Sequence, residues 1–141
     1  MNVEIITAAD VMKPSPRTCS RFSRVIEAVL IFKDEDCGMV PVVEEGKPIG
    51  AVTDRDVALA LAKFSNDLAE RSVEEVMMES PVTVLTTATR DEITDAFRDA
   101  GVRRLMVIDG AGLLQGVIGW KDLSVAVSER EVGRVVTGVV Q

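Results

Sequence analysis

The sequence contains no histidine, which removes the usual general base at neutral pH and the commonest metal ligand in proteins. Its two cysteines, Cys19 and Cys37, are too few for a four-ligand zinc site, and their spacing matches no paired-cysteine motif. Serine triads, cysteine–histidine pairs and histidine-based zinc sites are therefore excluded. We expect a protein without a metal centre that is not an enzyme.

Long apolar runs and a basic excess are also missing. The longest apolar runs are about five residues, against the ~20 that a membrane-spanning helix needs. The first four residues, Met-Asn-Val-Glu, lack the basic region of a signal peptide. The 16 Lys and Arg residues are outnumbered by 23 Asp and Glu residues, and the net charge of −7 repels a phosphate backbone. The sequence predicts a cytoplasmic protein that binds neither membranes nor nucleic acids.

What the sequence does contain is a tandem repeat. Thr7-Ala-Ala-Asp10-Val11-Met12 recurs 65 residues later as Ser72-Val-Glu-Glu75-Val76-Met77. After one inserted residue, Gly50-Ala-Val-Thr53-Asp-Arg-Asp56 recurs at an offset of 66 as Gly116-Val-Ile-Gly119-Trp-Lys-Asp122. We divide the chain into a first motif at 7–65, a second motif at 72–130 and a C-terminal tail at 131–141.

Each copy has the pattern β-α-β-β-α. Thr7 and Ser72 each stand three residues before an acid, the arrangement of a capping box that starts a short helix. Apolar residues recur at helical spacing in 25–32 and 93–100, and two apolar runs separated by a Gly-containing turn then predict a buried hairpin. Further helices are expected at 54–63 and 120–128. Because a unit of about 60 residues buries its apolar face poorly alone, the two copies should pack together in one α+β fold.

These motifs resemble those of tandem cystathionine-β-synthase (CBS) domains, two of which form a Bateman module. The matching segments are Asp10-Val11-Met12, Met39-Val40-Pro41-Val42-Val43 and Gly50-Ala-Val-Thr53-Asp-Arg-Asp56, with their counterparts in the second copy. The resemblance covers nearly the whole chain, although Gly119 replaces the Ser or Thr of the family signature. It implies a stand-alone pair of motifs related by an approximate two-fold axis.

The resemblance implies a non-catalytic regulatory module that binds an adenosine-containing nucleotide between the motifs and signals to a separate protein. AMP, ADP or ATP is the expected ligand, and S-adenosylmethionine is less favoured. Asp56 would accept the ribose hydroxyls, while Thr53 and the amides of a helix start would hold a phosphate. Thr53 and Asp56 also form a capping box that needs no ligand, so both interpretations stay open. The alternative function is an assembly module with two degenerate, empty clefts.

In the family, each cleft combines the signature of one copy with the first strands of the other. The favoured site here contains Thr53, Arg55, Asp56, Thr83, Val84, Arg103, Arg104 and Leu105. The weaker site contains Thr18, Cys19, Gly38, Met39, Val40, Gly119, Lys121 and Asp122. The first is favoured for a phosphorylated ligand because arginine grips a phosphate bidentately. Alternatively, the two arginines form a solvated junction that offsets the acidic surface.

Other features leave two interpretations each. Cys19 and Cys37 are apolar fillers or, if their strands are adjacent, a disulfide. Trp120 covers the second cleft or packs at a helix start. In the tail, apolar residues alternate with other residues as in a strand, but their spacing also satisfies the period of a helix. We expect a homodimer that pairs through the helices carrying Val25, Val29, Phe32, Ile93 and Phe97.

Overall fold

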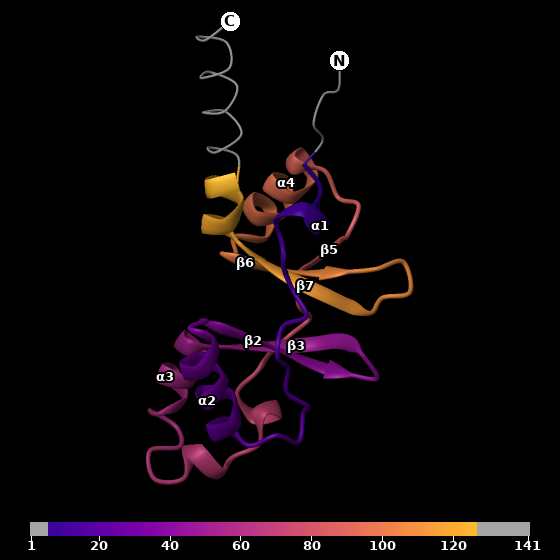
Figure 1. The fold of residues 1–141 in the computed structure, drawn as a ribbon. Helices are drawn as coiled ribbons and strands as arrows, with labels where there is room; N and C mark the ends of the chain where they lie inside the picture. The colour runs from indigo at the N-terminus through magenta and orange to yellow at the C-terminus, as the bar shows by residue number, and fades with distance from the viewer. Residues whose placement is uncertain (1–5, 127–141) are drawn as a thin grey trace, which may run out of the picture.

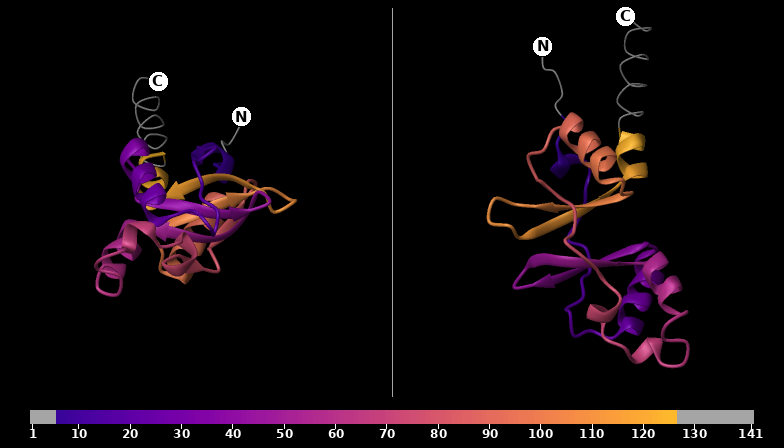
Figure 2. Two further views of the ribbon diagram at one scale, coloured as in Figure 1. Left: turned by 90° about the horizontal axis from the view of Figure 1, so that it is seen from below. Right: turned by 180° about the vertical axis from the view of Figure 1, so that it is seen from behind.

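The computed structural model describes residues 6–126, which form two stacked halves (Figure 1). A sheet in each half faces the other half, and helices cover the outer side of each sheet, so the layers run helix, sheet, sheet, helix (Figure 1). The view from behind shows the same order (Figure 2). The α+β pair predicted from the repeat is confirmed.

The first half is built on the sheet β2-β3-β4. Its strands are β2 (Met39–Glu44), β3 (Lys47–Thr53) and β4 (Met78–Glu79), and its helices are α2 (Val25–Glu35), α3 (Asp54–Ala60), and the 3-10 turns η1 (Leu68–Glu70) and η2 (Val73–Glu75). β2 and β3 form the expected antiparallel hairpin. The buried cluster of this half includes Val40, Val42 and Val52 of the hairpin with Ala28 and Ile31 of α2.

The second half is built on the sheet β1-β7-β6-β5. Its strands are β1 (Lys13–Pro14), β5 (Thr83–Leu85), β6 (Arg104–Ile108) and β7 (Leu114–Gly119), and its helices are α1 (Ala8–Val11), α4 (Arg90–Ala100) and the helical residues 120–126. β6 and β7 form the second antiparallel hairpin, and β5 runs parallel to β6. The tail at 131–141, whose structure the sequence left open, lies outside the described residues.

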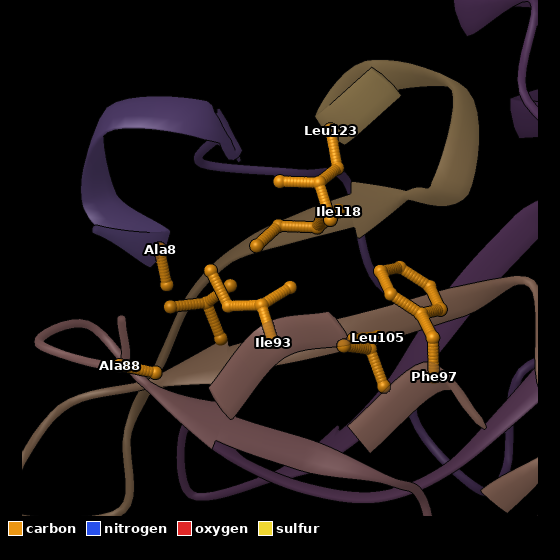
Figure 3. Packing of buried hydrophobic residues seen from close by; sticks show 8 residues of the cluster. Ala8, Ala88, Ile93, Phe97, Leu105, Ile118 and Leu123 are labelled. Carbon is orange, nitrogen blue, oxygen red and sulfur yellow. The ribbon is translucent and has the colours of Figure 1, made fainter. Parts of the chain in front are cut away.

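Each sheet takes one edge strand from the other repeat. β1 of the first repeat pairs with β7 of the second, with Lys13 opposite Val117. β4 of the second repeat pairs with β3 of the first, with Met78 opposite Ala51. The exchange includes α1, because Ala8 donates its N–H to the Ala88 carbonyl at 2.9 Å and lies in the core of the second half (Figure 3). The two halves are therefore intertwined.

Three of the five residues expected to pair two chains are buried within one chain, while Val29 and Phe32 are half-buried. Val25, Ile93 and Phe97 are only 1%, 0% and 4% exposed, because the helices lay them on the sheets of their own chain. Figure 3 shows Ile93 and Phe97 in the buried cluster with Leu105 and Ile118. The large apolar side chains that α2, α3 and the following turn do expose are Leu30, Leu59 and Leu61.

Candidate ligand-binding site

The two signature motifs start helices in the same way. In the first, Thr53 donates its N–H to Asp56 Oδ2 at 3.0 Å, and Asp56 donates its N–H to Thr53 Oγ1 at 3.1 Å. In the second, Gly119 donates its N–H to Asp122 Oδ2 at 2.9 Å. Both aspartates therefore serve as helix caps, as the ligand-free interpretation requires. Each bond uses Oδ2, which leaves the acceptor capacity of Oδ1 for a ligand hydroxyl.

A cavity of about 540 Å³ lies at the second of these helix starts, between the two halves. It is lined by Lys13, Asp36, Cys37, Gly38, Met39, Arg103, Arg104, Val117, Gly119, Trp120, Lys121 and Asp122. The start of β2 supplies one wall, while the start of β6, the end of β7 and the helix start at residue 120 supply another. Its volume is in the range of small-molecule sites in proteins.

The sheet register explains why these side chains converge. Arg104 lies opposite Gly119, and two residues further along, Val117 lies between Met106 and Lys13. Residues directly opposite one another in a sheet share a face, so Arg104 and Lys13 lie on the same face as Met106. Met106 packs against Met39 and Ala51 of the other sheet, so this is the face between the halves.

Two contacts fix the position of the arginine pair. Trp120 donates its backbone N–H to the Arg103 carbonyl at 2.9 Å, which ties the helix start to the residue that precedes β6. The guanidinium of Arg104 lies over Gly38, so a Cβ at that position would overlap it and would come within 3.0 Å of Asp54 Oδ2. The missing side chain of Gly38 therefore lets an arginine of one half reach across to the other.

Several cations of residues 6–126, Arg55 and Arg90 among them, form no ion pair, and four such cations gather at the cavity. Lys13, Arg103, Arg104 and Lys121 form no ion pair with any residue of 6–126. By contrast, Arg17, Arg21, Arg24, Arg71 and Arg98 all pair with carboxylates. In a chain of net charge −7, the cavity thus gathers four cations and only two carboxylates, Asp36 and Asp122. Such a site attracts anions.

Trp120 combines the two roles that the sequence left open. Its ring meets the ring of Phe97 edge to face, with centroids 5.4 Å apart and an interplanar angle of 82°. It also lines the cavity and is 47% exposed. A smaller cavity, lined by Thr94, Phe97, Arg98, Val102 and Trp120, shares this residue with the larger one.

The two cysteines are free thiols. Burial raises the pKa of Cys19, which lies in the core of the first half. Burial also raises the pKa of Cys37, and the hydrogen bond from the Met39 backbone and the positive charges of Lys13 and Arg104 oppose this only in part. Both thiols are therefore predominantly protonated at neutral pH, and the Cys37 thiol donates to the Ile31 carbonyl at 3.8 Å.

The cavity groups the predicted residues differently from the sequence analysis. It joins Met39, Lys121 and Asp122 of the weaker site to Arg103 and Arg104, which were assigned to the favoured site. The lining does not include Thr18, Cys19, Val40, Thr53, Arg55, Asp56, Thr83, Val84 or Leu105.

The alternation of side chains along a strand explains three of these positions. Met39 and Arg104 lie on the face between the halves, so their neighbours Val40 and Leu105 point to the helices and are 0% exposed. Cys19 forms a bridge with Val42 and is 4% exposed in the same core as Val40. The side chains of these three residues are packed in the two cores, away from the cavity.

Sequence analysis missed four lining residues, Lys13, Asp36, Cys37 and Val117. Lys13 was missed because no strand was expected at Lys13-Pro14, which joins the sheet of the second half. The available signal was the repeat itself, in which Lys13 corresponds to Met78 at the offset of 65. Within 6–126, no cluster of His, Cys, Asp or Glu could hold a metal ion, and no helix is long and apolar enough to cross a bilayer.

A family model of the CBS domain matches this chain twice, at residues 8–63 and 73–129. The chain belongs to the CBS domain family. Among CBS relatives, it is 29% identical over 131 residues to the CBS domain-containing protein YhcV of Bacillus subtilis, with 92% of each chain covered. A second Bacillus subtilis relative, the uncharacterized protein YlbB, is 30% identical over 124 residues, which are 86% of this chain and 82% of that one.

The CBS-pair fold is confirmed by similarity to solved structures. The CBS domain pair of protein MJ0100, solved with 5′-methylthioadenosine and S-adenosyl-L-methionine, superposes with a TM-score of 0.80 at 23% identity, covering 90% of this chain and 99% of that one. The CBS domain protein PAE2072 from Pyrobaculum aerophilum, solved with AMP, gives a TM-score of 0.75 at 22% identity, covering 83% and 89%.

Proposed function

We propose that this CBS pair is a non-catalytic regulatory module that binds an adenosine-containing nucleotide in the cavity beside Asp122 and signals its presence to a separate protein. The observation that carries the proposal is the set of four cations around this cavity, which form no ion pair within residues 6–126. Adenosine compounds bound to MJ0100 and PAE2072, which have the same fold, support the ligand class. AMP, ADP and ATP are the candidates, ahead of S-adenosylmethionine.

The chemistry of the lining matches the parts of a nucleotide. Asp122 keeps one carboxylate oxygen free of its capping bond, and a carboxylate accepts hydrogen bonds from ribose hydroxyls. Arg103 and Arg104 supply guanidinium groups, which bind phosphate in bidentate geometry. A sulfonium cation would gain nothing from these arginines, which is why a phosphorylated ligand is preferred.

The charges at the two helix starts favour the cavity over the site at Thr53. The first turn of α3 carries Asp54 and Asp56 with one cation, Arg55. The corresponding residues of the second motif are Trp120, Lys121 and Asp122, so an aromatic ring replaces one of the two acids. Because like charges repel, a phosphate is held less well beside the two acids of α3 than beside Lys121.

A ligand in this cavity would connect the two halves. Gly38 and Met39 come from the first half, whereas Arg104 and Asp122 come from the second. A ligand that contacts both walls stabilises the relative position of the two halves in which both contacts form. Binding thereby shifts the population toward this conformation, which a partner protein could recognise. This provides a route for signalling without catalysis.

The test is a melting-temperature screen with adenosine, AMP, ADP, ATP and S-adenosylmethionine. A ligand at ~100 times its Kd stabilises the folded state by roughly 2.7 kcal/mol, a rise in Tm of roughly 5–10 °C for a chain of this size. Binding of at least one phosphorylated compound supports the proposal. No shift with any of them, together with a stable oligomer, would favour the ligand-free assembly module instead.

A further inference from the structure

The four cations of the cavity are more than one phosphate needs. Two guanidinium groups suffice to hold a monophosphate, and both are supplied at the start of β6, by Arg104 and by Arg103 just before it. Lys13 and Lys121 then remain in the lining without an anion from the ligand or from residues 6–126. Asp36 and Asp122 of the lining offset part of this charge, but neither forms an ion pair with Lys13 or Lys121, so both ammonium groups are available to further phosphates.

We propose that the cavity selects nucleoside diphosphates and triphosphates over the monophosphate, and that Lys13, supplied by the exchanged strand β1, is the residue that makes this selection. The inference rests on the proposed function and specifies its ligand. The outer phosphates of the chain would lie toward Lys13, while the phosphate next to the ribose would lie on the arginine pair.

The sheet geometry places Lys13 two strands across and two residues along from Arg104, so a ligand that contacts both must be longer than a single phosphate. β7 lies between β1 and β6, and neighbouring strands are about 4.8 Å apart, so the backbones of β1 and β6 are roughly 10 Å apart. Lys13 and Arg104 nevertheless share the face between the halves. Lys13, Arg104 and Cys37 all line this one cavity.

The repeat offers an internal comparison for Lys13. Its counterpart in the second repeat is Met78, which lies opposite Ala51 on β3 as Lys13 lies opposite Val117 on β7. Strand exchange therefore delivers an ammonium group to one of the two related positions and an uncharged thioether to the other. Selection by phosphate number is confined to the cavity at Asp122, because the position at Thr53 has no equivalent cation.

The experiment compares AMP, ADP and ATP by calorimetric titration of the full chain without divalent cations. The test variant is Lys13→Met, which installs the residue found at the related position, and the matched control is Lys33→Met on the exposed side of α2. Lys13 is exposed and lies in a two-residue strand, so the variant should keep the fold, which circular dichroism and melting would verify. Lys13→Arg keeps the charge and should rescue the selection.

For the wild type we expect ATP or ADP to bind about tenfold or more tightly than AMP, the scale of one charge-assisted contact. Lys13→Met should remove most of this preference and leave AMP binding nearly unchanged, whereas Lys33→Met should alter neither. Equal or tighter binding of AMP by the wild type would overturn the inference, as would an equal loss for AMP and ATP in Lys13→Met.

A titration with tripolyphosphate separates this inference from the proposed function. If every adenosine compound fails to bind but tripolyphosphate binds and requires Lys13, the adenosine proposal is wrong and the phosphate-chain site stands. If AMP binds well and neither ATP nor tripolyphosphate depends on Lys13, the nucleotide proposal stands and the selection by Lys13 is wrong. If nothing binds, both are wrong.

Discussion

Replacement of Asp122 should separate ligand binding from helix capping. The Asp122 carboxylate accepts the Gly119 N–H at 2.9 Å and faces the cavity, so Asp122→Ala removes both a cap and the proposed ribose contact. Loss of the charged hydrogen bonds to the ribose should cost about 1.5–3 kcal/mol, which is roughly a 10- to 150-fold increase in the Kd of the nucleotide. Loss of the cap should cost about 1 kcal/mol of folding stability.

Two further variants assign these two effects. Asp122→Asn keeps an acceptor for the Gly119 N–H but removes the charge, so it should lose affinity while its Tm stays close to that of the wild type. Asp56→Ala removes the equivalent cap, in which Thr53 donates to Asp56 at 3.0 Å, so it should lose stability while its affinity is unchanged. Asp56→Ala is a matched control, because the repeat places the two aspartates at equivalent positions.

Calorimetric titration of AMP and ATP gives the affinities, and thermal melting of the same samples without ligand gives the stabilities. A loss of affinity in Asp56→Ala but not in Asp122→Ala would refute the assignment and restore the site at Thr53 that the sequence favoured. Unchanged affinity in all three variants would show that neither carboxylate contacts the ligand.

Three other predictions concern phosphate recognition, the core and assembly. Arg103→Ala should weaken AMP by about tenfold while leaving adenosine unchanged, because only the phosphate contact is lost; equal effects on both ligands in calorimetry would contradict this. Ile93→Ala, at a position that is 0% exposed, should lower the unfolding free energy by about 2–5 kcal/mol in urea titrations, and a loss under 1 kcal/mol would show that the core relaxes around the gap. The homodimer stays a prediction, and its contact should now involve Leu59 and Leu61, so light scattering should give a dimeric mass that Leu59→Glu reduces.

Much of the fold could be predicted because local signals agree with one another. The capping boxes at Thr7 and Thr53 mark helix starts that the structure confirms at α1 and α3. The two hairpins follow from apolar runs separated by short turns. Such features depend on neighbouring residues, and a single sequence therefore contains them.

The strand exchange could not be predicted in the same way. β1 and β4 are two residues long, and each pairs with a strand from the other repeat. Nothing in the composition of Lys13-Pro14 specifies which sheet it joins, since the choice depends on how the halves pack. Arg104 shows the same limitation, because its guanidinium occupies space above Gly38 that exists only after the two sheets have come together.

The pairing of Lys13 with Val117 has a consequence for how the chain acquires its structure during synthesis. These partners are more than a hundred residues apart, so the second sheet gains its edge strand only after the ribosome has made nearly all of the described residues. Contacts between residues so far apart in the sequence slow folding. The chain loses the conformational entropy of the long intervening loop before the strand pairing can stabilise the fold. A lone copy of either repeat, expressed as a separate polypeptide, would lack one edge strand and carry an unused one, so we expect the pair of repeats, and not a single repeat, to fold as a unit.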